Sequence, residues 1–128
     1  MANKYGNRKV ITSDGEVFDS QKEAMRYRDL KFLESCGAIS ELKRQVHFEL
    51  LPVQRERSTK VYKKGKKKGQ PREGKVIEKA VVYIADFVYT DTTTGKQVVE
   101  DTKGVKTKDY VLKRKMMLYF HGIKIREE

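Results

Sequence analysis

The chain is short and strongly basic. Its 128 residues suit a single domain, and with 38% hydrophobic against 37% charged residues that domain can bury only a small core. Lysine and arginine total 29 against 18 acids, a net charge of +11 at neutral pH. Such an excess favours a polyanionic partner, and nucleic acid is the commonest. Because Cys36 is the only cysteine, an intrachain disulfide and a cysteine zinc site are both excluded.

The sequence lacks the apolar segments that membrane proteins carry. No stretch approaches the roughly 18 apolar residues that span a bilayer. The first ten residues lack the apolar core of a signal peptide. We therefore expect a cytoplasmic protein that makes no membrane contact.

A hairpin and a helix are predicted at the N-terminal end. Residues 8–18 alternate around a turn at residues 13–15, which predicts a β-hairpin. Ser20 and Glu23 then form a capping-box pattern, so a helix is expected from there to about Ser35. Its buried stripe is expected to hold Ala24, Tyr27, Leu30 and Leu33.

Three strands are expected next. From Leu42 the apolar pattern changes to period two, which places Gln45 on the face opposite Leu42. Residues 80–89 form a second, apolar strand. The turn at residues 91–95 joins it to a third strand over residues 97–104.

A second helix is predicted from the cap Thr107 to about His121, and Gly122 ends it. Its core stripe is expected to hold Leu112, Met116 and Tyr119. Residues 123–127 close the chain as a short strand. The order after the hairpin is α-β-β-β-α-β, which predicts an α/β fold with a small mixed sheet flanked by two helices, in one domain over residues 1–128.

One segment is far more basic than the rest of the chain. Between Arg55 and Lys75 ten basic residues meet two acids, a net charge of +8. The alternating flanks predict that the first two strands continue outward as a hairpin, a basic arm over residues 55–78 with a flexible, glycine-rich tip. Two interpretations of the tip lysines stay open: they contact phosphates, or they belong to a loop that is only solvated. These are Lys63, Lys64, Lys66, Lys67 and Lys68.

Two carboxylates are expected on neighbouring strands. Asp86 lies in the apolar strand and can lie across from Asp101 of the next one, where alternation places Lys103 on the same face and Glu100 on the other. Two carboxylates that meet in apolar surroundings repel each other unless a cation lies between them. A divalent cation with oxygen ligands would lower the pKa of a bound water and stabilise charge on a phosphate. The pattern predicts phosphodiester hydrolysis, with Lys103 orienting the water or holding a phosphate oxygen.

Nearly the whole chain resembles the PD-(D/E)XK nuclease superfamily, and it is most similar to small phage proteins of the Holliday-junction-resolvase-like group. The similar stretches are KYGNRKV, GEVFDSQKEAMRY, the region of Gln45, YIADFVY, VVEDTKGVKT and the basic second helix. The resemblance assigns the motif acids to Asp86 and Asp101 and the motif lysine to Lys103. It implies that Glu23 is a further metal ligand.

The resemblance also implies a restriction-endonuclease-like core with the order α-β-β-β-α-β. It implies Mg²⁺ as cofactor, with Mn²⁺ as a substitute, and a DNA substrate that includes branched junctions. Gln45 is expected to support the metal site. A phage-encoded enzyme of recombination or replication would act in the host cytoplasm. It would act as a homodimer, since two symmetric cuts need two active sites. Ala85 stands where the motif's name has proline.

Several alternatives stay open at the level of the sequence. A capping box explains Glu23 without any metal. The lysines beside the second helix either contact the DNA backbone or only face water; they are Lys106, Lys108 and Lys113. The whole protein is either an endonuclease, a non-catalytic nucleic-acid-binding accessory protein, or a protein-interaction factor whose charge serves solubility.

Overall fold

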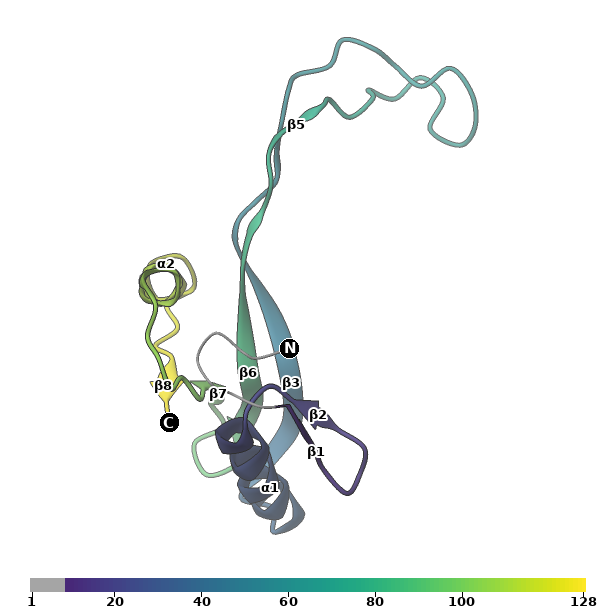
Figure 1. Ribbon diagram of the computed structural model, residues 1–128. Helices are drawn as coiled ribbons and strands as arrows, with labels where there is room; N and C mark the ends of the chain where they lie inside the picture. Colours follow the sequence, from purple (N-terminus) through teal and green to yellow (C-terminus); the bar gives the residue numbers. More distant parts are fainter. Residues whose placement is uncertain (1–8) are drawn as a thin grey trace. The chain divides into compact units, whose positions relative to one another are not determined.

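A computed structural model describes residues 9–128 (Figure 1). The N-terminal hairpin consists of β1 (Val10–Ile11) and β2 (Val17–Phe18), which pair antiparallel. In its turn Gly15 has a φ of 87°, a conformation that residues with a Cβ rarely adopt. The predicted hairpin is confirmed, and its expected first residue, Arg8, lies outside the described residues.

Helix α1 (Gln21–Ser35) begins and ends as predicted. The Ser20 side chain accepts a hydrogen bond from the backbone N–H of Glu23 at 3.1 Å, which satisfies one of the free N–H groups at the helix start. The predicted stripe is confirmed, with two buried and two partly buried members: Ala24, Leu30, Tyr27 and Leu33.

The longer strands form one four-stranded mixed sheet. They are β3 (Ile39–Leu51), β6 (Val81–Asp91), β7 (Gln97–Asp101) and β8 (Arg126–Glu127). The strands lie in the order β3-β6-β7-β8, with β6 and β7 antiparallel and β7 and β8 parallel. This confirms an α/β fold with a mixed sheet and two helices. β3 begins at Ile39 rather than Leu42, and β8 is shorter than predicted.

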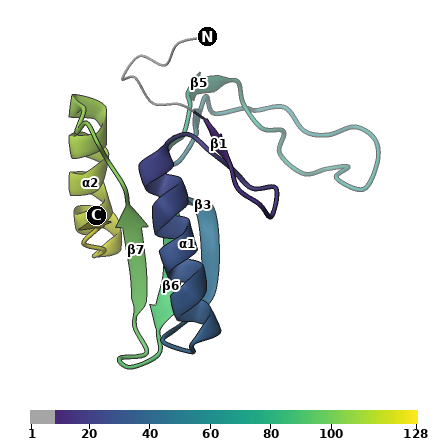
Figure 2. The same cartoon turned by 60° about the horizontal axis from the view of Figure 1, so that its bottom comes forward.

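The main core lies between the sheet and α1. Phe87 and Tyr89 of β6 are 0% and 3% exposed and cluster with Phe18, Ala24 and Leu30. Figure 2 shows α1 running across this face of the sheet. Since full burial of a large apolar side chain contributes roughly 1.5–3 kcal/mol, this cluster is what holds the hairpin, α1 and β6 together.

Helix α2 (Lys108–His121) has the predicted bounds. The Thr107 side chain accepts a hydrogen bond from the backbone N–H of Tyr110 at 3.1 Å, and Gly122 ends the helix in the left-handed conformation with a φ of 66°. The two caps confirm both ends of the predicted helix.

The predicted core stripe of α2 is wrong. Leu112 is 58% exposed and Tyr119 is 83% exposed, whereas Tyr110 and Met117 are 5% and 0% exposed. The reason is that apolar residues occur almost all round this helix, so its period does not decide which side is buried. The side that carries Tyr110 faces the protein, and the predicted stripe faces solvent.

The basic arm belongs to a compact unit of its own. This unit spans Glu49–Tyr83, and the other comprises the described residues up to Phe48 together with Ile84–Glu128. Within the arm, β4 (Gln54–Arg55) pairs antiparallel with β5 (Val76–Glu78). The structure therefore has the predicted hairpin between the first two long strands, although its pairing is confined to short pieces.

The tip of the basic arm contains hydrogen-bonded turns. The backbone N–H of Tyr62 donates to the carbonyl of Gln70 at 3.0 Å, and that of Gly69 donates to the carbonyl of Tyr62 at 2.8 Å. Lys67 and Arg72 lie 5.6 and 5.8 Å from the centre of the Tyr62 ring. The tip lysines are thus carried by hydrogen-bonded turns around an aromatic ring.

Among the described residues, neither helix is long and apolar enough to span a bilayer.

Candidate active site

The two predicted motif acids lie at the same end of a strand pair. Phe87 pairs with Glu100 in the β6–β7 ladder, so Asp86 and Asp101 are the next residues along the two strands. Asp101 is fully buried. Asp86 is half-buried, and its Oδ2 accepts two hydrogen bonds of 2.9 Å, from the backbone N–H and the hydroxyl of Thr102. Both carboxylates are therefore held in place by the chain around the end of β7.

Lys103 lies beside Asp101, as predicted, but for a different reason. β7 ends at Asp101, so strand alternation does not extend to Lys103. The chain beyond the strand nevertheless brings the Lys103 Nζ to 3.5 Å from the Asp101 Oδ1. The same ammonium group lies 5.4 Å from the centre of the Tyr110 ring. Burial raises the pKa of Tyr110, and its hydrogen bond to Glu127 and the charge of Asp101 raise it further.

Glu100, the neighbour of Asp101, has a separate structural role. It is fully buried, it forms an ion pair with Arg26 of α1 through two nitrogens, and it accepts a hydrogen bond from the Tyr89 hydroxyl at 2.7 Å. Burial raises the pKa of Tyr89 to about 12, and Glu100 adds to the shift. The prediction that Glu100 and Asp101 point to different surroundings is confirmed, because Glu100 contacts α1 while Asp101 contacts Lys103.

Glu23 lies buried at the start of α1 and contacts the predicted supporting residue. It is 5% exposed, and its Oε1 accepts a hydrogen bond from the Gln45 Nε2 at 3.0 Å. The Arg44 Nη2 lies 3.6 Å from the same oxygen. Burial raises the pKa of Glu23 to about 7, and the negative charge of Asp86 raises it while Arg44 opposes the shift. Glu23 and Asp86 are thus close enough to repel each other.

We expect Glu23→Gln to stabilise the metal-free protein at neutral and alkaline pH. Folding raises the Glu23 pKa from its ordinary value of 4.5 to about 7, so the folded state binds this proton more tightly than the unfolded chain does. The resulting stability is fully present below pH 4.5 and is lost as the pH rises to about 7. At pH 8 the loss is at most about 3 kcal/mol, since one pKa unit corresponds to about 1.4 kcal/mol.

Urea unfolding in EDTA at pH 4 and pH 8 measures this effect. The gain in unfolding free energy should occur at pH 8 and should be small at pH 4. The matched control is Asp29→Asn, which removes an exposed carboxylate of the same helix and should change neither value. Equal stability of Glu23→Gln and the parent at pH 8 would show that the Glu23 charge is fully compensated in the fold.

The predicted ligands suit a hard divalent cation in their chemistry. Asp86, Asp101 and Glu23 offer carboxylate oxygens, and the repulsion between Glu23 and Asp86 is what a cation would relieve. Among the described residues, however, no three histidine, cysteine or carboxylate side chains come close enough together to hold a metal ion. The chemistry of the side chains, and not their spacing, suits Mg²⁺ or Mn²⁺, and the ligand role of each carboxylate stays a prediction.

Two residues that hold the site together were not predicted from the sequence. Thr102 fixes Asp86, as described above, and nothing in its sequence position indicates this. The Arg44 guanidinium lies 3.7 Å from the centre of the Phe18 ring, donates to Glu16 at 2.6 Å and lies beside Glu23. Its position offered a signal, because Arg44 is the charged residue on the otherwise apolar face of the predicted strand.

The predicted DNA-contacting lysines divide into two groups. The five tip lysines of the basic arm are all exposed, as is Lys108 of α2. The Lys106 Nζ lies 3.4 Å from Glu127, and Lys113 is half-buried. Of the three predicted lysines near α2, Lys106 and Lys108 are thus exposed, and Lys106 lies beside Glu127.

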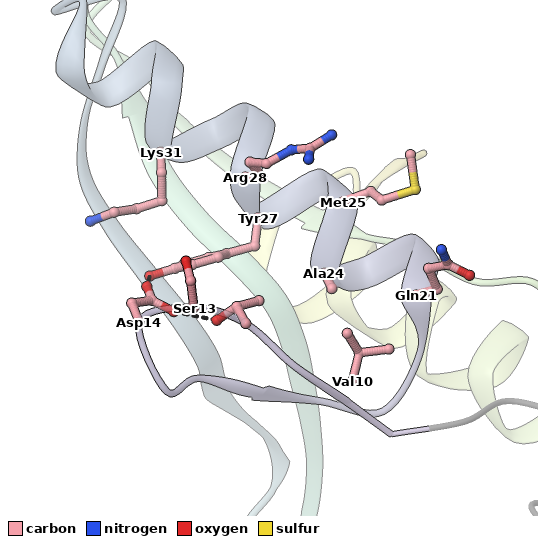
Figure 3. Close-up of a pocket in the computed structure, with 10 residues that line it drawn as sticks. Val10, Ser13, Asp14, Gln21, Ala24, Met25, Tyr27, Arg28 and Lys31 are labelled. Atoms are coloured by element: carbon pink, nitrogen blue, oxygen red, sulfur yellow. Dashed lines mark hydrogen bonds between the residues drawn. The ribbon is translucent and has the colours of Figure 1, made fainter.

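A separate cavity of about 430 Å³ lies between the β1–β2 hairpin and α1 (Figure 3). Val10, Ala24 and Met25 line its apolar part, and the Tyr27 hydroxyl donates to Asp14 at 3.2 Å at its polar end. None of the predicted site residues lines this cavity. The candidate active site is therefore built where the β6–β7 pairing ends and not in this cavity.

Comparison with known proteins yields a family. No curated protein and no solved structure matches the chain. One family model matches the chain over residues 2–126, and its description is "Protein of unknown function (DUF1064)". Because this match covers almost the whole chain, the protein belongs to the DUF1064 family.

Proposed function

We propose that this protein is a metal-dependent endodeoxyribonuclease with an active site of the PD-(D/E)XK type. The observation that carries the proposal is the pair Asp86 and Asp101 on neighbouring strands where the β6–β7 pairing ends, with the Lys103 Nζ 3.5 Å from Asp101. A protein that only binds nucleic acid gains nothing from buried acids beside a phosphate-facing surface. The net charge of +11 supports a polyanionic substrate.

The order of the elements supports the finer fold assignment. Without the hairpin β1–β2 and the arm strands β4 and β5, the element order is α1, β3, β6, β7, α2, β8. This is the α-β-β-β-α-β order of the restriction-endonuclease-like core. In that core the two motif acids belong to the second and third strands, which correspond here to β6 and β7.

Each proposed residue has a defined task. Asp86 and Asp101 would hold Mg²⁺ or Mn²⁺, with Glu23 as a further ligand. When bound, the ion lowers the pKa of a water molecule and neutralises charge on the phosphate. Thr102 fixes the Asp86 oxygen and leaves its Oδ1 available, and Gln45 orients Glu23. The Lys103 ammonium group orients the attacking water or binds a phosphate oxygen.

A cleavage assay tests the proposal. The full chain is incubated with linear, flapped and four-way DNA in Mg²⁺, Mn²⁺, Ca²⁺ or EDTA. We expect cleavage in Mg²⁺ and Mn²⁺ and none in EDTA, with branched DNA preferred. Tight DNA binding without cleavage in any metal would favour a non-catalytic accessory protein. If four-way junctions are cut at two symmetric positions, the active species is expected to be a homodimer.

The basic arm is expected to supply sequence-independent affinity. Replacing its five tip lysines with serine removes exposed charges from the folded tip, and each lost phosphate contact contributes about 0.9 to the slope of log affinity against log salt on duplex DNA. If about half of these lysines contact phosphates, the slope becomes shallower by roughly two. Sequence preference should hardly change, because phosphate contacts do not read bases. The variant is Lys63, Lys64, Lys66, Lys67 and Lys68→Ser.

Titrations from low to moderate salt measure this slope on linear and branched DNA. The control is the same set of positions replaced by arginine, which keeps the charge and should keep the slope. A larger loss on branched DNA would mean that the arm reaches between duplex limbs. An unchanged slope on both substrates would show that the tip lysines are only solvated, and that the binding surface lies elsewhere.

A further inference from the structure

The outward side of α2 has an unusual composition. Tyr110 and Met117 mark the buried side, and at 3.6 residues per turn a line of four exposed residues lies opposite them. These are Lys108, Leu112, Lys115 and Tyr119. Lysines and apolar side chains therefore alternate along the helix. We call this line, together with Phe120, the outer face of α2.

The apolar members of the outer face are strongly exposed. Leu112 is 58% exposed, Tyr119 is 83% exposed and Phe120 is 50% exposed. The Tyr119 and Phe120 rings pack edge to face, with centroids 5.1 Å apart and an interplanar angle of 86°. Large apolar groups that gather on a surface mark a contact site for another molecule. The helix thus presents two rings side by side at its C-terminal end.

Acids near α2 are engaged on the inner side. Glu127 accepts hydrogen bonds from Tyr110 at 3.0 Å and from Arg114 at 3.2 Å, and it also lies 3.4 Å from Lys106. Asp109 is the only acid within α2. Lys108 and Lys115 consequently give the outer face a positive charge. The partner of this face must be both anionic and able to cover apolar rings.

The charge pattern disfavours three of the possible partners. A second copy on the outer face would bring lysines against lysines in a parallel pair, and in an antiparallel pair it would cover Lys108 and Lys115 with apolar side chains and no acid. A membrane-bound helix needs its apolar and charged residues on separate sides, whereas here they alternate on one line. A partner helix on the apolar seam of Leu112, Met116 and Tyr119 would have to place acids against Lys108 and Lys115, which lie beside that seam.

We propose that the outer face of α2 binds unpaired nucleotides of single-stranded DNA. Tyr119 and Phe120 stack on bases, and Lys108 and Lys115 contact phosphates. Positive charge interleaved with aromatic rings is the combination by which proteins hold single strands. From Lys108 to Tyr119 the helix rises about 16 Å, which spans roughly five nucleotides of a stacked strand. The inference rests on the proposed function for its choice of DNA, and it adds that the substrate carries unpaired bases.

Binding in EDTA tests this inference without any cleavage. The probes are a fluorescent oligothymidine and a blunt duplex of equal length, and the variant is Tyr119→Ala with Phe120→Ala in the full chain. We expect at least a tenfold loss of affinity for oligothymidine and less than a twofold loss for the duplex. The control is Phe32→Ala, which removes a ring that is 67% exposed on α1 and should change neither affinity. Tyr119→Trp should retain or strengthen oligothymidine binding.

Four outcomes of these measurements would overturn the inference. Equal losses on both probes would make the outer face a general DNA contact, and no loss on either would mean that the rings do not touch DNA. A parent dimer that dissociates in the double variant, or binding to anionic phospholipid vesicles that the variant loses, would assign the face to a second copy or to a membrane. If single-strand binding depends on the rings but no DNA is cleaved in any metal, the inference stands and the nuclease proposal fails.

Discussion

Asp86→Asn and Asp101→Asn should each abolish DNA cleavage while leaving DNA binding intact or tighter. Each substitution removes a proposed metal ligand where the β6–β7 pairing ends, and the ion would supply several kcal/mol of transition-state stabilisation. Because about 1.4 kcal/mol corresponds to tenfold in rate, the loss should reach about a thousandfold. Binding is spared or improved because a negative charge disappears from the path of the phosphates. Cleavage in Mg²⁺ and affinity in Ca²⁺ measure the two effects separately.

Asp29→Asn is again a suitable control, because it makes the same chemical change at an exposed position of α1. It should retain the parent's rate. Thermal unfolding must show that Asp101→Asn is still folded, since this carboxylate is fully buried. Full activity in both Asp86→Asn and Asp101→Asn would refute the assignment of the active site.

Arg26→Ala should lower the free energy of unfolding by about 3 kcal/mol without changing the residues of the proposed active site. The substitution leaves the fully buried Glu100 carboxylate without the cation that it pairs with. Removing one partner of a buried pair costs about 3–5 kcal/mol, and the partial exposure of Arg26 argues for the lower end. Domains of this size are stable by only about 5–15 kcal/mol, so urea unfolding will show the loss clearly.

Arg28→Ala is the matched control, because this arginine lies on the same helix and is exposed. Its effect should stay within about 0.5 kcal/mol. Glu100→Gln should likewise lower stability and keep the cleavage rate per folded molecule. An inactive Glu100→Gln beside an active Asp101→Asn would show that Glu100, and not Asp101, is the catalytic acid. A loss below 1 kcal/mol for Arg26→Ala would place the pair among ordinary surface ion pairs.

Local patterns in the sequence predicted the bounds of both helices. Ser20 and Thr107 cap them, and Gly122 ends α2, because these side chains and backbone conformations act within a single turn. The alternation of residues along a strand is also a local pattern, so the bounds of β3 and β6 were predicted to within a few residues. Such elements do not depend on what the rest of the chain does.

The buried side of α2 was not predictable in the same way. Apolar residues on several sides of this helix offer more than one stripe, and only the packed sheet selects Tyr110 and Met117 over Leu112 and Tyr119. The same limit applies to the site. Sequence spacing indicated Asp86, Asp101 and Lys103, but the Thr102 contact to Asp86 and the Arg44 contact to Glu23 depend on how distant elements meet.

The position of the basic arm between β3 and β6 determines which mutations the fold tolerates. Residues 52–80 leave the sheet between β3 and β6, two strands that lie side by side. The entropy of closing a loop grows only with the logarithm of its length, so doubling such a segment costs about 0.6 kcal/mol. Lengthening, trimming or recharging the arm therefore has little effect on whether β3 and β6 pair. Mutation of the arm can therefore change which nucleic acids the chain attracts without altering the acids Asp86 and Asp101 of β6 and β7.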